Sequence, residues 1–528
     1  MNAFEHAHPY DEPMTASRNA PPADGEERES EATTGGGPPG RRQRIGLVLG
    51  PALLFLMLFS PPPEGMEPAA WRAAAVGVLM AVWWVSEAIP IPATALVPLA
   101  LFPILGVLGI EAAAAPYANS VIFLFLGGFL IAAAMQRWEL HKRIALLVIL
   151  AVGTQPIRLI GGFMIASGFL SMWVSNTATA VMMLPIGLSV IHLALPRGPD
   201  GRIAPEDSNF AVALMLGIAY ACSIGGLGTL IGTPPNALLA GYMQEAYGVQ
   251  IGFAEWMVLG VPLVLIGLPL SWFVLTRVAY PVRLKGIPGG ADTIRLELRK
   301  LGGWTRGEQR VGIVFVTAAI AWIFRPVLEA WIPGLSDAGI AIGAAIVLFL
   351  LPVDWDRGIF VIEWDDARTL PWDVLVLFGG GLSLAAAISQ TGLAAWIGAE
   401  LAGLQALPTI GLILAVTLVV IFLTELTSNT ATAAAFLPIL GSLAVGIGEN
   451  PLVLVVPAAL AASCAFMMPV ATPPNAIVYG SSFVTIPQMA KAGIYLNVLF
   501  TGLITGLGYA LIVLAFGVEA GVLPEWAR

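Results

Sequence analysis

The chain has 528 residues, of which 57% are hydrophobic and 11% are charged. Soluble domains carry roughly 25% charged residues, whereas runs such as 208–244, 374–399 and 452–490 contain no Asp, Glu, Lys or Arg. Each run exceeds the roughly 20 residues that a helix needs to cross a bilayer. Composition therefore excludes a soluble enzyme, a nucleic-acid-binding protein and a disordered scaffold, and it predicts an all-α polytopic membrane protein.

The net charge of −9 is concentrated at the N-terminus. Residues 1–40 hold eight acidic side chains against Arg18 and Arg28, so 2 − 8 = −6 of the charge lies there. A segment this polar and rich in Pro and Gly cannot bury enough apolar surface to fold. We predict that residues 1–44 are a disordered, acidic cytoplasmic tail of unknown role.

Basic residues predict the orientation of the rest of the chain. They cluster at 41–44, 137–143, 197–202 and in the amphipathic stretch 277–310, and none occurs between 369 and 490. The positive-inside rule places such clusters in the cytoplasm. We therefore expect a cytoplasmic N-terminus, a cytoplasmic amphipathic connector at 281–309, about 11 transmembrane helices and insertion into the cell inner (plasma) membrane.

Three landmarks occur twice, in the same order, about 240 to 250 residues apart. Ser-Asn-Thr-Ala-Thr-Ala at 175–180 returns at 428–433, Thr-Pro-Pro-Asn-Ala at 233–237 returns at 472–476, and the glycines at 127–128 have a counterpart at 379–381. Such self-similarity indicates an internal repeat. The chain is predicted to contain a first half at 45–280 and a second half at 310–528.

The charges that flank the two Ser-Asn-Thr segments predict how the halves are related. Arg158 and Arg197 flank the first segment, whereas Glu400 and Glu449 flank the second. One segment is therefore expected to enter the bilayer from the cytoplasm and the other from outside. Inverted-topology repeats of this kind are typical of secondary transporters.

Each Ser-Asn-Thr segment lies in the middle of an apolar stretch. Its flanks of about 16 residues would span roughly 24 Å as helices, which is short of the ~30 Å hydrocarbon core. Re-entrant helical hairpins at about 157–195 and about 407–447 fit these lengths better than straight crossings. The glycine pairs are expected to allow close helix packing.

The hairpin tips are predicted to hold a cation beside an anion. Ser and Thr hydroxyls, Asn carbonyls and free backbone carbonyls can replace the hydration shell of Na⁺, and half-helix N-termini suit a carboxylate. The prolines of each Thr-Pro-Pro-Asn should break a helix and expose the carbonyls of Gly232 and Ala471. The alternatives are polar contacts that hold helices together and ordinary proline kinks. Duplication of both motifs favours a site.

The remaining polar residues have less specific explanations. Glu425 and Glu87 are candidate intramembrane proton carriers, although a structural role is favoured for Glu425. His192 is expected at the membrane interface, and Cys222 and Cys464 are expected to be buried free thiols. Enzymatic and ATP-binding motifs are absent from the sequence, so no enzymatic activity is expected. A channel remains possible in principle.

These motifs resemble the divalent anion/sodium symporter family, which carries dicarboxylates, citrate and sulfate with Na⁺. The paired Ser-Asn-Thr segments, the stretch 462–478 and Ser-Glu-Ala-Ile-Pro at 86–90 carry the resemblance, which extends over about residues 45–518. The resemblance implies a membrane-embedded homodimer, without nucleic acid, in which each subunit has a scaffold domain and a transport domain that moves like an elevator.

The resemblance also implies residue roles. Sodium ligands are expected at Ser171, Ser175, Asn176 and Gly232, and at Thr424, Thr427, Asn429 and Ala471, where Thr427 would contribute its carbonyl. Substrate carboxylates are expected at Ser175, Asn176, Thr177, Ser428, Asn429, Thr430, Thr472 and Pro473. Two intact Ser-Asn-Thr copies favour import of C4-dicarboxylates such as succinate, malate or fumarate with Na⁺ as coupling ion. A sulfate or citrate symporter and a dicarboxylate exchanger are the alternatives, and the Na⁺ stoichiometry is left undetermined.

Overall fold

The computed structural model describes residues 40–195, 205–284, 286–287, 289–401, 403, 407–519 and 521–528. Nearly all of the predicted acidic tail and the basic cluster at 197–202 lie outside these residues. Residues 42–528 form one unit, and the contacts described below belong to it. The first helix begins at Arg41, three residues before the predicted end of the disordered tail, because Arg and Gln are good helix formers.

The described part of the first half is helical. Its elements are α1 (Arg41–Phe59), α2 (Pro68–Ser86), α3 (Ile91–Thr94), α4 (Val97–Ile104), α5 (Ile110–Ala114), η1 (Ala115–Ala118), α6 (Ser120–Arg137), α7 (Leu140–Val152), α8 (Pro156–Ser171), α9 (Asn176–Ala194), α10 (Pro205–Gly226), α11 (Pro234–Tyr247), α12 (Phe253–Phe273) and the π-helical η2 (Val274–Ala279).

The connector and the second half add one small antiparallel sheet. The elements are α13 (Gly290–Lys300), α14 (Arg306–Ile323), α15 (Arg325–Leu328), α16 (Asp337–Leu350), β1 (Pro352–Asp354), β2 (Ile359–Phe360), α17 (Trp364–Arg368), α18 (Trp372–Gln390), α19 (Leu393–Glu400), α20 (Thr409–Thr424), α21 (Asn429–Gly446), α22 (Leu452–Ala462), α23 (Pro473–Gly480), α24 (Ile486–Leu503), the π-helical η4 (Ile504–Gly508), α25 (Tyr509–Phe516) and η5 (Glu525–Ala527).

The connector turns into the second half at a capping box. The Thr305 hydroxyl accepts a hydrogen bond from the Glu308 amide, and the Glu308 carboxylate accepts one from the Thr305 amide. This reciprocal pair satisfies amides that the start of a helix leaves free. Helix α14 therefore begins at Arg306, four residues before the predicted boundary at 310.

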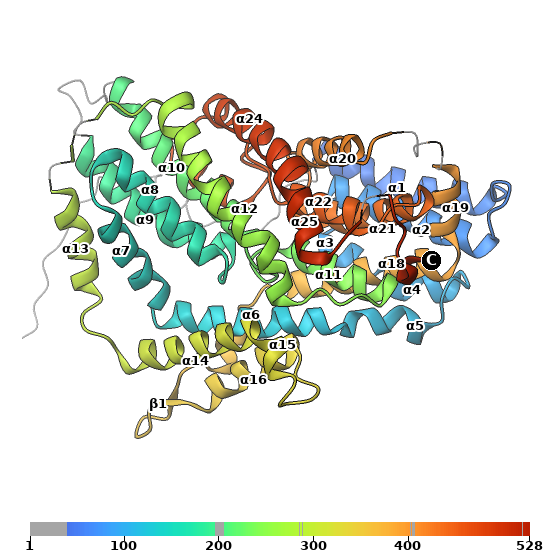
Figure 1. Ribbon diagram of the computed structural model, residues 1–528, viewed down its shortest axis with the longest axis horizontal. Helices are drawn as coiled ribbons and strands as arrows, with labels where there is room; N and C mark the ends of the chain where they lie inside the picture. The colour runs from blue at the N-terminus through green and yellow to red at the C-terminus, as the bar shows by residue number, and fades with distance from the viewer. Residues whose placement is uncertain are drawn as a thin grey trace, which may run out of the picture. The chain divides into compact units, whose positions relative to one another are not determined.

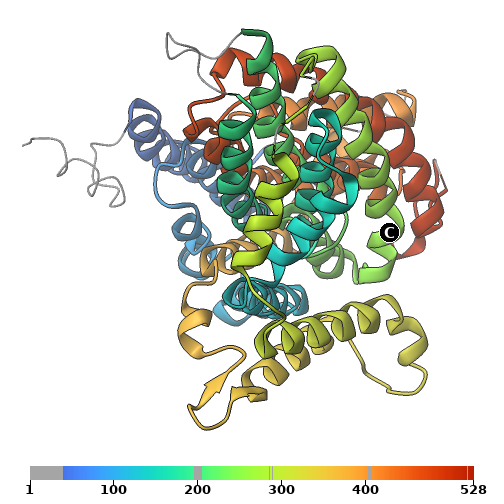
Figure 2. The ribbon, with the colours of Figure 1, turned by 90° about the vertical axis from the view of Figure 1, so that its left-hand side faces the viewer.

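The helices pack in two groups. In one group α6 lies along α16 and α14, while α18 packs against α2, α3 and η1; in the other, α8, α9 and α10 pack together, as do α20, α21 and α22. Figure 1 shows α14, α15 and α16 with β1 beside α6, and Figure 2 shows the same segments together from another side. Helix α11 joins the groups because it contacts α18 as well as α21 and α22.

The predicted glycine motifs, at 127–128 and 379–381, lie where neighbouring segments of the protein approach closely. A Cβ atom on Gly127 would stand 2.5 Å from the Ala341 carbonyl carbon, and one on Gly380 would collide with the Ala95 backbone. The next glycine of each pair faces elsewhere, because Gly128 meets Ile231, and Gly381 meets Ala434 at 3.2 Å and Leu238 at 3.5 Å. The expectation that these glycines allow close packing is confirmed.

Among the described residues, nine helical segments are long and apolar enough to cross a membrane. They include the hairpin arms α9 and α21, while α8, α16, α20 and α22 are shorter apolar helices. The chain is thus a helical membrane protein, and its number of crossings stays a prediction. The expectation for Cys222 and Cys464 is confirmed, because both are buried free thiols.

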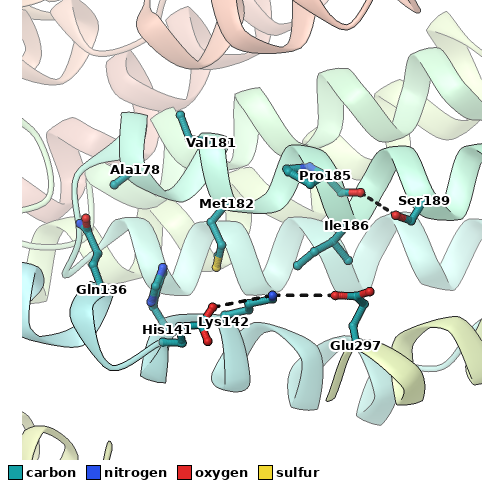
Figure 3. Close-up of a pocket in the computed structure, with 11 residues that line it drawn as sticks. Gln136, His141, Lys142, Ala178, Val181, Met182, Pro185, Ile186, Ser189 and Glu297 are labelled. Carbon is teal, nitrogen blue, oxygen red and sulfur yellow. Dashed lines mark hydrogen bonds and ion pairs between the residues drawn. The ribbon is translucent and has the colours of Figure 1, made fainter. Parts of the chain in front are cut away.

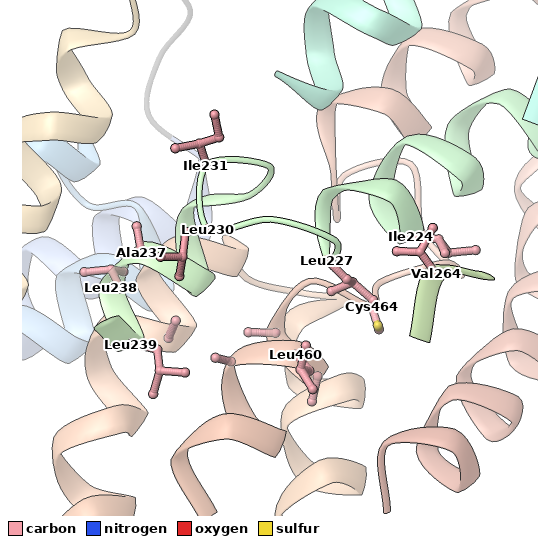
Figure 4. Packing of buried hydrophobic residues seen from close by; sticks show 14 of the residues in the cluster. Ile224, Leu227, Leu230, Ile231, Ala237, Leu238, Leu239, Val264, Leu460 and Cys464 are labelled. Atoms are coloured by element: carbon pink, nitrogen blue, oxygen red, sulfur yellow. The ribbon is translucent and has the colours of Figure 1, made fainter. Parts of the chain in front are cut away.

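The two broken helices lie side by side in the core. Helix α10 packs against α23, and α11 packs against α22. Figure 4 shows Leu227, which directly follows α10, beside Cys464 of the other break and Leu460 of α22. The hydroxyls of Thr233 and Ser463 are 3.4 Å apart, so the two breaks also meet through polar groups. This arrangement brings both Thr-Pro-Pro-Asn segments to one place.

Candidate substrate and cation site

A cavity of about 670 Å³ collects both hairpin tips and both helix breaks. Its volume lies within the range of small-molecule sites. The tips contribute Ser175, Asn176, Thr177, Ala178, Ser428, Asn429 and Thr430, and the breaks contribute Ile231, Gly232, Thr233, Pro234, Val470, Ala471, Thr472, Pro473 and Pro474. The duplicated motifs of the sequence therefore meet at a single site.

The two hairpin tips have matching internal hydrogen bonds. In the first tip the Ser171 hydroxyl donates to Asn176 Oδ1, and in the second the Thr424 hydroxyl donates to Asn429 Oδ1 over 2.7 Å. Within each pair, the donor and the acceptor are five positions apart in the sequence. The second pair lies 253 residues after the first (424 − 171 = 429 − 176). Each tip thus gathers a hydroxyl oxygen and an amide oxygen, two neutral ligand types suited to Na⁺.

The helix breaks are also held by matching hydrogen bonds. The Asn236 amide donates to the carbonyls of Gly226 (3.0 Å) and Thr229 (2.8 Å). The Asn475 amide donates to the carbonyls of Ala465 and Met468, both over 3.1 Å. Donors and acceptors are related by one offset of 239 residues. The Asn of each Thr-Pro-Pro-Asn therefore clamps its own loop, which fixes the path of the chain ahead of the prolines.

Gly232 in the first break lies close to the first tip. A Cβ atom placed on Gly226 would stand 3.0 Å from both Asn176 Oδ1 and the Gly232 carbonyl oxygen. The two oxygens therefore lie against Gly226, where any larger side chain would crowd them. Ala465 occupies the equivalent position of the second half.

Helix ends give the cavity its electrostatic pattern. Ser175, Ser428, Thr233 and Thr472 are the N-caps of α9, α21, α11 and α23. Four helix N-termini therefore reach the cavity, and each presents free amides and a positive dipole end. Helices α8 and α20 end just before the same tips, so carbonyl oxygens lie next to amides, as binding of a cation beside an anion requires.

The structure brings nearly all of the predicted residues to this cavity. The eight expected substrate residues and five of the eight expected sodium ligands line it: Ser175, Asn176, Thr177, Ser428, Asn429, Thr430, Thr472, Pro473, Gly232 and Ala471. Ser171, Thr424 and Thr427 are buried behind the lining. The Thr427 hydroxyl donates to the Leu423 carbonyl and lies 2.6 Å from the Thr432 hydroxyl, so it is engaged within its own hairpin, which favours the Thr427 carbonyl as the ion ligand.

The cavity also has acidic residues that sequence reasoning missed or left unassigned. Asp373 and Gln136 line it without having been predicted, and Glu87 was assigned only as a proton-carrier candidate. Glu87 is exposed and ends α2 with its backbone in the left-handed conformation, and Asp373 is exposed in the first turn of α18. Among the described residues that line the cavity, none is Lys, Arg or His. No local sequence signal marked Asp373, because it reaches the cavity through the packing of α18 against α11 and α21.

Glu425 is placed behind the second tip and does not line the cavity. It is buried, and its carboxylate accepts hydrogen bonds from the backbone amides of Phe466, Met467 and Met468 and from Asn497. This set of contacts indicates a structural anchor rather than a proton carrier. His192 is exposed and packs against the ring of Phe483.

A second cavity of about 540 Å³ adjoins the first. Gln136 and Ala178 line both cavities. Figure 3 shows a dashed line from the Lys142 ammonium to Glu297, and this ammonium lies 3.8 Å from carboxylate oxygens of both Glu297 and Glu139. The cation of this neighbouring cavity is therefore already balanced by acids.

Solved structures share this fold. The chain aligns with the Alcanivorax borkumensis YdaH transporter at a TM-score of 0.51 and 15% identity, over 78% of this chain and 87% of that one. It aligns with Neisseria gonorrhoeae MtrF, described as one of a class of antimetabolite efflux pumps, at a TM-score of 0.54 and 14% identity, over 89% and 94%. At these identities the likeness concerns the fold alone.

The sequence comparison is more specific. Residues 42–516 match the family model for the sodium:sulfate symporter transmembrane region, and the chain belongs to this family. The sodium-dependent dicarboxylate transporter SdcS of Staphylococcus saprophyticus is 46% identical over 90% of this chain and 93% of its own length. SdcS of Staphylococcus aureus strain USA300 is 43% identical over 90% and 92%.

Proposed function

We propose that this protein is a secondary active transporter that imports C4-dicarboxylates such as succinate, malate and fumarate together with Na⁺. The observation that carries the proposal is the single cavity in which both Ser-Asn-Thr tips and both helix breaks meet. Membership of the sodium:sulfate symporter family and the names of the SdcS relatives agree with it.

The charges of the cavity explain why sodium is needed. A dianion that enters would find helix N-termini but no cationic side chain among the described lining residues, and it would meet Glu87 and Asp373. Because unlike charges attract strongly where water is scarce, Na⁺ ions held beside the tips would neutralise the cargo. Anion affinity is therefore expected to depend on sodium, so an inward Na⁺ gradient would drive uptake.

Two cation sites follow from the matched tips. The first would use Ser171, Ser175, Asn176 and the Gly232 carbonyl, and the second Thr424, Asn429 and the carbonyls of Thr427 and Ala471. Matching contacts at each tip and break support the pair. The carboxylates of the substrate would bind between them, at Ser175, Asn176, Thr177, Ser428, Asn429, Thr430, Thr472 and Pro473.

The packing supports an elevator-type mechanism with inverted repeats. Helices α8–α12 and α20–α25 would form the transport domain, and α2–α6, α14, α16 and α18 the scaffold. Helices α7 and α19 follow the scaffold helices α6 and α18 and pack against the hairpin helices α8 and α21, as connecting arms would. Two such subunits would form a homodimer of about 11 crossings per chain in the plasma membrane, with the N-terminus in the cytoplasm.

Uptake into proteoliposomes tests the proposal. Radiolabelled succinate should accumulate with an inward Na⁺ gradient and should not accumulate when choline replaces Na⁺. Unlabelled malate and fumarate should compete, whereas dominance of citrate or sulfate would select the alternative cargo. Equal uptake in choline would remove the coupling, uptake that requires internal dicarboxylate would indicate an exchanger, and flux without saturation would indicate a channel.

A further inference from the structure

Glu425, at the end of α20 behind the second tip, has an unusually complete set of donors. Its side chain is 3% exposed. Oε1 accepts from the amides of Phe466 (2.7 Å) and Met467 (2.9 Å) and from Asn497 Nδ2 (2.9 Å), while Oε2 accepts from the amides of Met467 (2.9 Å) and Met468 (3.0 Å). Every described partner here is a donor, so the surroundings of Glu425 are built to stabilise the carboxylate form.

The equivalent position of the first half carries no charge. Met172 lies 253 residues before Glu425, and its terminal methyl group is 2.8 Å from where a Cβ on Gly228 would stand. The amides of Leu227 and Gly228 donate to carbonyls of their own chain, those of Ile224 (3.1 Å) and Gly225 (2.9 Å). The equivalents of the Phe466 and Met467 amides in the first half are thus satisfied locally.

The lengths of the broken helices reflect this difference. Helix α10 continues to Gly226, whereas α22 ends at Ala462, which is equivalent to residue 223 of the first half (462 − 239). The second half therefore lacks the last three helical residues, and the amides that follow turn to Glu425 instead. The Asn236 and Asn475 clamps are alike, and in the first half the Thr229 hydroxyl donates to the Met172 carbonyl, so both breaks are linked to their tips. The charged link through Glu425 is what distinguishes the second loop.

We infer that Glu425 makes the two cation sites unequal, so that the second site is preformed and takes its ion first. Glu425 follows the expected ligand Thr424 directly and ties the second tip to the loop that carries Ala471. A fixed negative charge beside the site favours a cation. The five hydrogen bonds to Glu425 also hold the second tip more firmly than the single Thr229–Met172 hydrogen bond holds the first, and a more firmly held tip loses less conformational entropy when the ion binds. Glu425 is a positioning residue in this scheme, which rests on the proposed function.

Glu425→Gln tests the role of the charge. The variant loses the charge and turns an amide group toward backbone donors. The Na⁺ concentration for half-maximal succinate uptake should rise about tenfold, a change of about 1.4 kcal/mol, while the maximal rate at saturating Na⁺ stays close to that of the wild type. A lower maximal rate with an unchanged sodium requirement would overturn the inference.

Glu449→Gln is the matched control in the same half. Glu449 is also a buried carboxylate, which accepts from the Gly521 amide over 2.9 Å and from the Thr409 hydroxyl, and it does not line the cavity. Its replacement should leave the sodium requirement unchanged. An equal shift in both variants would show a general effect of losing a buried carboxylate and would contradict the specific role of Glu425.

Hydrogen exchange of the wild-type protein tests the binding order without any substitution. In the absence of substrate, amides of 463–472 should become protected at lower Na⁺ concentration than those of 224–233, with choline as control. Coincident midpoints, or earlier protection of the first loop, would refute the order. If wild-type uptake itself proved independent of Na⁺, the proposed function would fail; sodium-driven uptake with coincident midpoints would remove only this inference.

Discussion

The hydroxyl of Thr424 donates a hydrogen bond of 2.7 Å to Oδ1 of Asn429, across the four residues that form the second hairpin tip. The Ser171 hydroxyl makes the same contact with Asn176 in the first tip. Both amide oxygens are therefore held in place before any ligand arrives. Because a preorganised ligand needs no rearrangement, these two asparagines should contribute most to cation binding.

Asn176→Ala and Asn429→Ala should each reduce sodium-driven succinate uptake about 30-fold or more, since an unpaired buried polar partner costs about 2 kcal/mol. Both proteins should still elute as folded material in size-exclusion chromatography. Asn209→Ala serves as control, because Asn209 contacts the Pro281 carbonyl far from the tips in sequence. Wild-type kinetics in either tip variant would show that the motif serves only packing.

Gly226→Ala should weaken the first cation site. The added methyl group would stand 3.0 Å from Asn176 Oδ1 and from the Gly232 carbonyl, so it would push apart the oxygens expected to hold the ion. Overpacking of this size costs about 1 to 3 kcal/mol, and the sodium requirement should rise about tenfold. Ala465→Gly, at the equivalent position of the second half, should change the sodium curve little. A larger change in the sodium requirement for Ala465→Gly than for Gly226→Ala would contradict the placement of a cation site beside Gly226.

Asp373→Asn should lower the KM for succinate at saturating Na⁺. Asp373 and Glu87 are the acidic residues that line the cavity. Removing one of these negative charges weakens the repulsion of a dianion, so the affinity for succinate should rise roughly threefold. The effect should shrink as ionic strength rises, since exposed charges are screened. A KM that is unchanged at low ionic strength would place Asp373 outside the substrate path.

The buried pair Arg143–Glu308 should make stability depend on pH. Arg143 Nε donates to Glu308 over 2.6 Å, which ties α7 to the start of α14. Burial alone would raise the pKa of Glu308, but hydrogen bonds from Arg143 and from the Thr305 backbone hold that pKa below its ordinary value. The stabilisation is therefore complete above a pH of about 4.5, the ordinary pKa, and is lost as the pH falls through the lowered value.

Glu308→Ala measures this contribution. The variant leaves Arg143 with the carbonyls of Leu301, Gly302 and Gly303 as its remaining partners, so we expect a loss of about 3 kcal/mol in the free energy of unfolding at pH 7. Thermal melting should show a constant difference between the two proteins above a pH of about 4.5, the ordinary pKa, and convergence as the pH falls below it. A difference that stays constant below this pH would show that ionisation of Glu308 plays no part.

The site could be predicted from the sequence because its parts are local and duplicated. Proline fixes the breaks beside Gly232 and Ala471, and polar residues in the middle of apolar runs mark the tips. The part of the site that each half supplies could therefore be predicted from that half alone. That all four parts meet in one cavity followed from the symmetry of the motifs rather than from any contact visible in the sequence.

Other features depend on contacts between distant segments and could not be read in advance. Asp373 lines the cavity because α18 packs against α11 and α21, and no local pattern specifies that neighbour. The role of Glu425 depends on amides 41 to 43 residues further along the chain. The starts of α1 and α14 were missed by three or four residues, since charged residues can extend a helix beyond an apolar segment.

The acid-lined cavity also bears on leakage. A carrier whose own lysines or arginines held the anion could release it to either side without sodium and would dissipate a gradient already built up. Here the described lining supplies no such counter-charge, so a carrier stripped of its ions has little hold on a dianion. When Na⁺ is absent from both sides of the membrane, an accumulated dicarboxylate should therefore leave slowly through this protein, because efflux needs bound ions as much as uptake does.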